Sequence, residues 1–222
     1  MTASIDMALA VARVSLRLGK VERATRHEDG SRETDTTHTV MLALLAMEIA
    51  PALGMSAGRA AQFAVVHDLH EAYAGDVDTM CGLSPEEASA KAEREKAAIG
   101  QLTADLGPGA RVPGLLRWYE MQVEPEARLV RLLDKVLPKL THFLSRGVAL
   151  AEKGLTLEDV QRSHTLQARA LIDQYPEMGA VHHLFADACK LAESVSGETT
   201  SGYLARLERE GGDEPVDAEE TA

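Results

Sequence analysis

Cysteine is almost absent from this sequence of 222 residues, which contains only Cys81 and Cys189. Two cysteines this far apart provide neither a disulfide framework nor the CxxC spacing of a cysteine-rich zinc site. A closed structural metal centre, which is mostly built from cysteines, is therefore disfavoured. The same scarcity fits a protein of the reducing cytoplasm.

Aromatic residues, long apolar runs and positive charge are also scarce. Only 4% of the residues are aromatic, whereas alanine and leucine are prominent, which favours helix over sheet. No stretch reaches the roughly 20 apolar residues of a membrane span, and charges interrupt residues 5–18, so we expect no membrane span and no signal peptide. The formal net charge of −12 argues against a broad nucleic-acid-binding surface.

Signatures of several enzyme classes are missing as well, including the GxxxxGK[ST] phosphate loop and the GxSxG nucleophile turn. The sequence instead shows one helical pattern after another, separated by glycine, proline and capping residues. The predicted helices cover residues 3–19, 35–49, 56–73, 84–106, 111–122, 125–146, 156–174 and 177–195. Residues 20–35 are charged and lack periodicity, which predicts a loop.

These patterns predict an all-α fold with one large domain over residues 1–197. A C-terminal helical extension is expected over residues 198–210. Residues 211–222 are acidic and almost without large apolar side chains, which predicts a disordered tail. The clearest helix start is Ser84-Pro85-Glu86-Glu87, with a capping serine, a proline in the first turn and early acids.

Four residues with metal-binding side chains stand out: His38, the dipeptide His67-Asp68 and Asp134. His38 shares a helix face with Leu42, and Asp134 is also flanked by apolar residues. Burying a carboxylate costs several kcal/mol unless a cation pairs with it. A hydrogen-bonded core histidine and an arginine partner for Asp134 are the alternatives. Together the four predict one divalent cation, and Mn, Co, Mg, Zn, Fe and Ni are all compatible with such ligands.

Two acids near the dipeptide are candidate catalytic residues. Glu71 lies four residues after His67 and three after Asp68, so the three side chains can face one pocket. A carboxylate beside a metal commonly takes or gives the proton in hydrolysis. Asp76 follows Gly75 just past the predicted helix end, where it can contact a sugar hydroxyl or orient water. A surface glutamate and an ordinary turn aspartate are the alternatives.

Three arginines are candidates for binding a phosphate. Arg131 lies one turn before Asp134 on the same helix face, where it can pair with that acid or reach an oxyanion. Arg23 and Arg26 lie in the predicted loop before the helix of His38. A mobile basic loop of this kind is able to clamp a phosphate. For each arginine, a solvated surface position is the alternative.

The metal-ligand pattern resembles the HD-domain metal-dependent phosphohydrolases, and within them the 5′-deoxynucleotidase-like branch. The resemblance is carried by ETDTTHTVMLALLA (33–46), VVHDLHEAYAGD (65–76) and EPEARLVRLLDKVLPK (124–139). It implies a helical bundle with a metal site in its core, often assembled as a homodimer. It also implies that Glu71 assists the attacking water, that Asp76 lies at the sugar, and that Arg23 is the family's loop arginine. Ala24 stands where that branch usually has a tryptophan.

The sequence therefore predicts a phosphohydrolase with one divalent metal ion as cofactor, releasing phosphate from deoxynucleoside 5′-monophosphates. Its partner would be a small nucleotide, with neither nucleic acid nor membrane involved. Removal of triphosphate from deoxynucleoside triphosphates, as in some relatives, is an alternative. A non-catalytic nucleotide sensor on the same fold is another. The presence of Glu71 argues against the sensor, because a pure binder needs no group to activate water.

Overall fold

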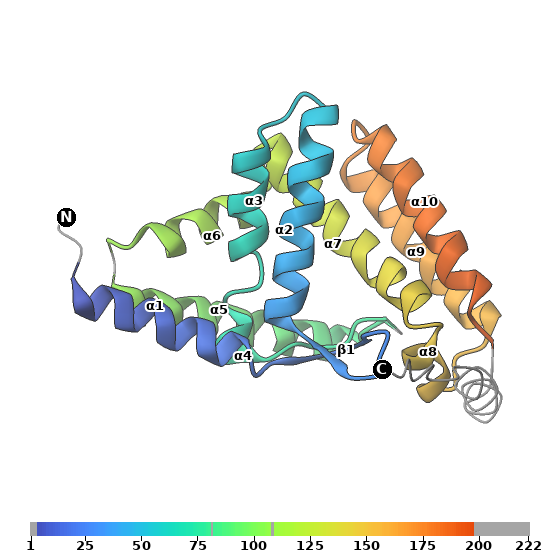
Figure 1. Cartoon of the computed structure of the whole chain (residues 1–222), viewed down its shortest axis with the longest axis horizontal. Coiled ribbons are helices and arrows are strands. Elements are labelled where there is room, and N and C mark those ends of the chain that lie inside the picture. Colours follow the sequence, from blue (N-terminus) through green and yellow to red (C-terminus); the bar gives the residue numbers. More distant parts are fainter. Residues whose placement is uncertain (1–3, 81, 108, 198–222) are drawn as a thin grey trace, which may run out of the picture.

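The computed structural model describes residues 4–80, 82–107 and 109–197 and is mostly helical, as predicted (Figure 1). Its elements, in chain order, are α1 (Ile5–Leu18), β1 (Glu22–Arg26), β2 (Arg32–Thr34), α2 (Asp35–Ala52), α3 (Ala57–Val66), α4 (Glu71–Ala74), α5 (Pro85–Leu106), α6 (Arg111–Met121), α7 (Pro125–Leu144), α8 (Val148–Glu152), α9 (Leu157–Gln174) and α10 (Gly179–Ser194). The predicted extension over 198–210 and tail over 211–222 lie outside the described residues.

Helix α7 forms the centre of the molecule. It crosses between the α2–α3 pair and α10, and it packs against all three (Figure 1). A helix covered on several sides must be apolar over most of its surface, and α7 buries a long series of residues for this reason. The buried apolar ones are Ala127, Leu129, Val130, Leu132, Leu133, Val136 and Leu137. The helix continues through Pro138 to Leu144.

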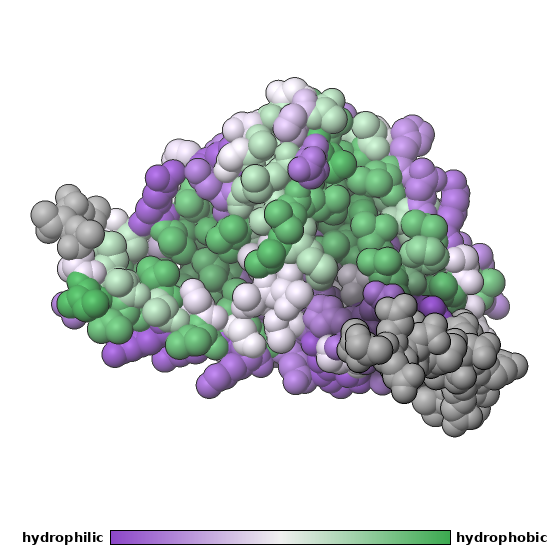
Figure 2. All heavy atoms as spheres, viewed as in Figure 1, coloured by the Kyte–Doolittle hydropathy of each residue, from purple (hydrophilic) through white to green (hydrophobic). Residues whose placement is uncertain are grey.

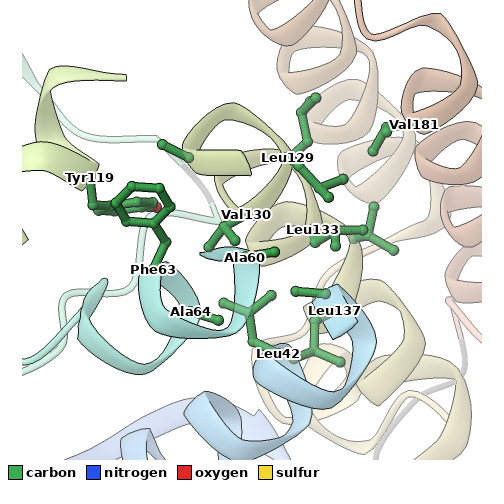
Figure 3. Close-up of a cluster of buried hydrophobic side chains, with 14 of the residues drawn as sticks. Leu42, Ala60, Phe63, Ala64, Tyr119, Leu129, Val130, Leu133, Leu137 and Val181 are labelled. Atoms are coloured by element: carbon green, nitrogen blue, oxygen red, sulfur yellow. The ribbon is translucent and has the colours of Figure 1, made fainter. Parts of the chain in front are cut away.

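The hydrophobic core joins the three helices that carry the candidate metal ligands. Leu42 of α2, Phe63 of α3 and Leu133 of α7 are fully buried and belong to one apolar cluster (Figure 3). The ring of Phe63 lies 6.2 Å from that of Tyr119 on α6. Burial of one such side chain contributes about 1.5–3 kcal/mol, so this cluster fixes α2, α3 and α7 relative to one another.

The predicted loop over residues 20–35 is wrong, because this segment forms an antiparallel β-hairpin. Strands β1 and β2 pair from Glu22–Thr34 to Arg26–Arg32, and Gly30 provides the positive φ of 81° that the turn requires. The inward-facing residues are Thr25 and Glu33, which are buried although they are polar. The strands therefore lack the apolar alternation by which a half-buried strand is normally identified.

The helix predicted over 56–73 is broken in the structure. Helix α3 ends at Val66, and α4 begins at Glu71. Between them the backbone amides bond to the carbonyl three residues earlier, as in Leu69 to Val66 (3.2 Å) and Glu71 to Asp68 (2.8 Å). Three residues per turn place positions i and i+3 on the same side, so Asp68 and Glu71 come to face one cleft.

The remaining elements follow the sequence more closely. Helix α5 begins with the predicted signal, since Ser84 and Glu87 form a reciprocal capping box with Pro85 in the first turn. The helix predicted over 125–146 is confirmed as α7, which ends at Leu144, and α8, which follows Gly147 with its positive φ of 74°, was not predicted. None of the described helices combines the length and apolarity needed to cross a membrane.

One face of the molecule is unusually apolar. Figure 2 shows hydrophobic side chains gathered on this face. Val40, Leu44 and Met47 of α2 are all exposed, and they recur every three to four residues along one side of the helix. Helix α2 is thus apolar on its inner side, which packs against α3 and α7, and also on part of its outer side.

Candidate metal centre

Four potential ligands converge from three elements. His38 lies in the first turn of α2, His67 and Asp68 follow the end of α3, and Asp134 lies in the middle of α7. One ligand atom from each residue lies within 4.8 Å of the others. His38 Nε2 lies 3.0 Å and His67 Nε2 lies 3.6 Å from Asp134 Oδ1, and His67 Nε2 lies 2.9 Å from Asp68 Oδ2. This group can hold one divalent metal ion.

The two imidazoles are held with Nε2 facing the carboxylates. His67 Nδ1 donates a hydrogen bond of 2.8 Å to the carbonyl of Ala64, which leaves Nε2 as the free nitrogen. His38 Nδ1 lies 3.4 Å from Glu33 Oε1, and Thr25 donates a hydrogen bond to Glu33. Metal-binding histidines typically have a carbonyl or carboxylate at the other ring nitrogen, which fixes the ring and makes it a stronger ligand.

The burial of these groups also fits a cation. His67 is 1% exposed, and its Nε2, although 2.9 Å from Asp68 Oδ2, makes no hydrogen bond of good geometry among the described residues. Asp134 is 5% exposed and belongs to the apolar interior of α7, as predicted. Buried carboxylates and an unpaired imidazole nitrogen are costly unless a positive charge satisfies them. A divalent ion with imidazole and carboxylate ligands would meet that need.

The pKa values show how strongly the site favours positive charge. Burial alone would lower the pKa of His67, but the carboxylates of Asp68 and Asp134 raise it to about 10. Burial would likewise raise the pKa of each carboxyl. The imidazole of His67 instead holds the pKa of Asp68 below its usual range, and Lys135 with the two histidines does the same for Asp134. Without metal, a proton on His67 therefore supplies the positive charge.

Glu71 lies beside the four ligands but is not one of the group. Its Oε2 is buried without a hydrogen-bond partner in the described part of the chain and lies 3.9 Å from Arg23 Nη1. Burial, together with the carboxylates of Asp68 and Asp35, raises the pKa of Glu71 to about 11. The group therefore holds a proton in the absence of a nearby cation. A bound metal would favour its ionised form.

A cleft of about 160 Å³ lies over this site. Its lining includes the ligands Asp68 and Asp134, the candidate residues Arg23, Glu71, Asp76 and Arg131, and also Lys135. Lys135 Nζ lies 2.9 Å from Asp134 Oδ2. The structure thus brings the candidate site residues from the sequence, except Arg26, to the metal group or to the cleft above it.

The arginines occupy positions that differ from those expected. Arg23 lies on β1 rather than in a mobile loop, and its Nη1 pairs with Asp35 (2.9 Å) and Asp68 (3.4 Å). Arg26 pairs with Glu152 at 2.8 Å, and it does not line the cleft. The hairpin therefore places one rigid arginine at the site instead of a flexible basic clamp.

Arg131 lines the cleft as the sequence suggested, but its neighbours are different. Its guanidinium lies 4.8 Å from the centre of the Tyr119 ring and 3.4 Å from Glu120 Oε1. The expected pairing with Asp134 is formed by Lys135 instead. His70 also lines the cleft; it is buried, and its Nε2 lies 3.7 Å from Glu95 Oε1.

Three site residues were missed from the sequence: Glu33, Asp35 and Lys135. Asp35 looks like a helix cap, but the cap is Thr34, whereas Asp35 is fully buried against Arg23. The nearby Asp29-Gly30 pair is a hairpin signal that could have placed Glu33 on a strand leading into the site, with Asp35 directly after it. Lys135 follows Asp134 directly, and nothing in the sequence marks it.

Comparisons with known proteins agree with this geometry. A family model described as HD domain matches residues 16–175, well over half of the chain. The crystal structure of a predicted metal-dependent phosphohydrolase from Magnetospirillum magnetotacticum MS-1 superposes with a TM-score of 0.62. The two sequences are 24% identical over 85% of this chain and 96% of that chain, a level at which the likeness concerns the fold. No curated protein matches the sequence.

Proposed function

Because the chain belongs to the HD domain family, we propose that it is a metal-dependent phosphohydrolase that releases phosphate from deoxynucleoside 5′-monophosphates. One observation carries the proposal. Four imidazole and carboxylate ligand atoms lie within 4.8 Å of one another, beside a cleft lined by acids and arginines. The fold neighbour named a predicted metal-dependent phosphohydrolase supports the same reaction class.

His38, His67, Asp68 and Asp134 would hold the ion. When bound, a divalent cation lowers the pKa of coordinated water and withdraws electron density from a phosphoryl oxygen. Arg23 and Arg131 line the cleft from opposite elements, and their guanidinium groups can stabilise negative charge on the phosphate. Arg23 already faces two carboxylates, so an incoming phosphate must compete with Asp35 for it.

Glu71 would move the proton. Its buried carboxyl lies next to the metal group and has an unpaired oxygen among the described residues. The pKa of about 11 without metal and the shift toward ionisation beside a cation allow it to accept a proton from water. The same carboxyl can then return that proton to the departing sugar oxygen.

Asp76 would read the sugar. It lines the cleft just beyond Gly75, and burial raises its pKa. A carboxylate that accepts a hydrogen bond from the 3′-hydroxyl and packs close to C2′ leaves no room for a 2′-hydroxyl. Exclusion of this kind can amount to a few kcal/mol, so we expect at least about a tenfold preference for deoxyribonucleotides.

The test is a panel of ribo- and deoxyribonucleotides, as mono- and triphosphates of each base, assayed with Mn²⁺ or Co²⁺. We expect the highest kcat/KM for deoxynucleoside monophosphates and a loss of sugar preference in Asp76→Ala. Equal values for ribo- and deoxyribonucleotides in the wild type would rule out the deoxynucleotidase. Turnover of triphosphates alone would favour the triphosphohydrolase, and binding without any turnover would favour a sensor.

We also propose that the chain forms a homodimer. The exposed apolar side chains Val40, Leu44 and Met47 on α2 support this, because a contiguous apolar surface of a soluble protein commonly marks an interface. Light scattering after gel filtration would measure the mass, and Leu44→Glu should convert a dimer into a monomer. A location in the cytoplasm remains a prediction from the cysteine content.

A further inference from the structure

A second cavity adjoins the metal cleft on the other side of Asp134. It has a volume of about 100 Å³, and the two share the lining residues Arg23, Asp76, Val77, Thr79, Asp134 and Lys135. Beyond these shared residues, the second cavity is lined mainly by basic and polar side chains: Lys139, His142, Lys153, Ser163, His164 and Gln167. None of these six residues takes part in the proposed reaction.

The basic residues follow one side of α7. Arg131, Lys135 and Lys139 are four residues apart, so each lies about 6 Å further along the helix than the one before. Arg131 lines the metal cleft, Lys135 lines both spaces, and Lys139 lines only the second cavity. The two spaces therefore form a continuous path with a positive group at each step.

The positive charges differ in how they are compensated. Lys135 pairs with Asp134, and Lys153 pairs with Asp78. Lys139 is 6% exposed and has no carboxylate partner among the residues described. Its ammonium donates a hydrogen bond to the amide oxygen of Gln167 and lies 5.0 Å from the centre of the Phe185 ring.

His142 is the second unsatisfied group of this cavity. It is 5% exposed, and its Nδ1 has no hydrogen-bond partner within the described ranges. A buried ammonium without a counter-ion and a buried unpaired imidazole nitrogen, side by side in one cavity, are both costly to maintain. A bound anion would satisfy both.

We propose that the Lys139 cavity binds a phosphate group separate from the one at the metal centre. Lys139 would supply the charge, and His142 Nδ1 is available for a hydrogen bond, whereas the Ser163 hydroxyl already donates to the carbonyl of Met80. The site itself stands on its own geometry. Its use by an outer phosphate of a nucleotide substrate rests on the phosphohydrolase function proposed above, whereas its use by released inorganic phosphate would make it a product site.

The electrostatics of the cavity support an anion rather than a cation. Burial, with Lys135 nearby, lowers the pKa of Lys139 to about 8. Burial, with Lys139 and Lys153 nearby, lowers the pKa of His142 to about 3. Both shifts oppose a further positive charge. Three acids also line the cavity: Asp78 and Asp134 are already paired with lysines, and burial raises the pKa of Asp76, which disfavours its charged form.

The experiment titrates inorganic phosphate into the metal-loaded full-length chain by isothermal titration calorimetry. We expect two sites in the wild type. Lys139→Met should weaken one of them about 10- to 100-fold, as for the loss of a hydrogen bond to a charged group. Lys190→Met, which removes the same charge from an exposed residue of α10, should leave both unchanged. His38→Ala should lose the metal-centre site and retain the Lys139 site, because His38 does not line this cavity.

Unchanged phosphate binding in Lys139→Met overturns the proposal. If that variant fails to fold, His142→Phe, which keeps a ring of similar size without Nδ1, takes its place. A loss of severalfold supports the site, and unchanged binding overturns it.

Kinetic measurements then distinguish the two sources of the phosphate, which are the nucleotide substrate and the released product. If Lys139→Met raises the KM about tenfold for nucleoside diphosphates but not for monophosphates, the Lys139 cavity binds a phosphate of the substrate. If Lys139→Met leaves the KM values unchanged but weakens inhibition by inorganic phosphate, the cavity binds the released product. Absence of turnover on any nucleotide would contradict the proposed function and leave the phosphate titration valid.

Discussion

Replacing Asp134 by asparagine removes the charge at the centre of the metal group while keeping the shape of the side chain. Asp134 Oδ1 lies 3.0 Å from His38 Nε2, and Oδ2 lies 2.9 Å from Lys135 Nζ. Breaking a buried ion pair costs about 3–5 kcal/mol. Since folded proteins are stable by about 5–15 kcal/mol, the variant should remain folded with reduced stability.

Asp134→Asn should also bind the metal ion much more weakly than the wild type. Changes to groups that only support a metal ligand cost about 10–100-fold in affinity, so loss of a ligand carboxylate should cost at least about 100-fold. A metal present at 100 times Kd stabilises the native wild type by about 2.7 kcal/mol, which corresponds to roughly 5–10 °C for a chain of this size. The same concentration would stabilise Asp134→Asn by only about 1–2 °C.

Scanning calorimetry with and without Mn²⁺ measures both effects, and metal analysis after gel filtration measures occupancy. The matched control is Asp187→Asn, which removes the same charge from an exposed residue of α10. It should keep the full metal-dependent increase in Tm. Full occupancy and a full increase in Tm in Asp134→Asn would show that Asp134 is not a ligand.

Four further predictions concern the same centre. Glu71→Gln should keep metal affinity but lower kcat about 10²–10⁴-fold, and a loss below about threefold would make Glu71 a bystander. Metal affinity should rise with pH by up to about tenfold per pH unit below pH 10, because His67, with a pKa of about 10 without metal, must release its proton before it binds. Calorimetry in buffers of different ionisation enthalpy counts the released proton. A Kd that does not change with pH would contradict this prediction. Because the pKa of His67 is raised above 6.5 in the fold, the free energy of unfolding of the metal-free protein should fall as the pH rises from 6.5 to about 10. Urea titrations at several pH values measure this decrease. Glu33→Gln should weaken metal binding about 10–100-fold in competition with a chelator, and an unchanged Kd would mean that Glu33 does not orient His38.

The sequence was most informative where apolar periodicity and side-chain chemistry could be combined. His38 shares its helix face with Leu42, and Asp134 lies among the leucines of α7; in both cases the apolar neighbours correctly indicated burial. Local rules also sufficed at Ser84 and Glu87, where the cap depends on residues within one turn.

The failures occurred where tertiary contacts decide the local structure. Glu33 is buried as a partner of His38 and Thr25, so its strand carries a polar residue at an inward position. No glycine or proline marks the end of α3, because the tight turn after Val66 uses residues that are also compatible with a helix. Lys135 and Lys139 read as ordinary polar positions of α7, and only the packing of β1 and α9 around them encloses their cavity.

The metal group forms only when the helices that carry its ligands have packed together. His38 and Asp134 are 96 residues apart in sequence, yet their side chains lie 3.0 Å apart. Closing so long a loop costs entropy that local helix formation cannot offset, so the ligands meet only after α2, α3 and α7 have packed together. A partly folded chain can contain most of its helices and still lack the site. Metal binding during refolding should therefore follow the slowest, global phase rather than the early gain of helix.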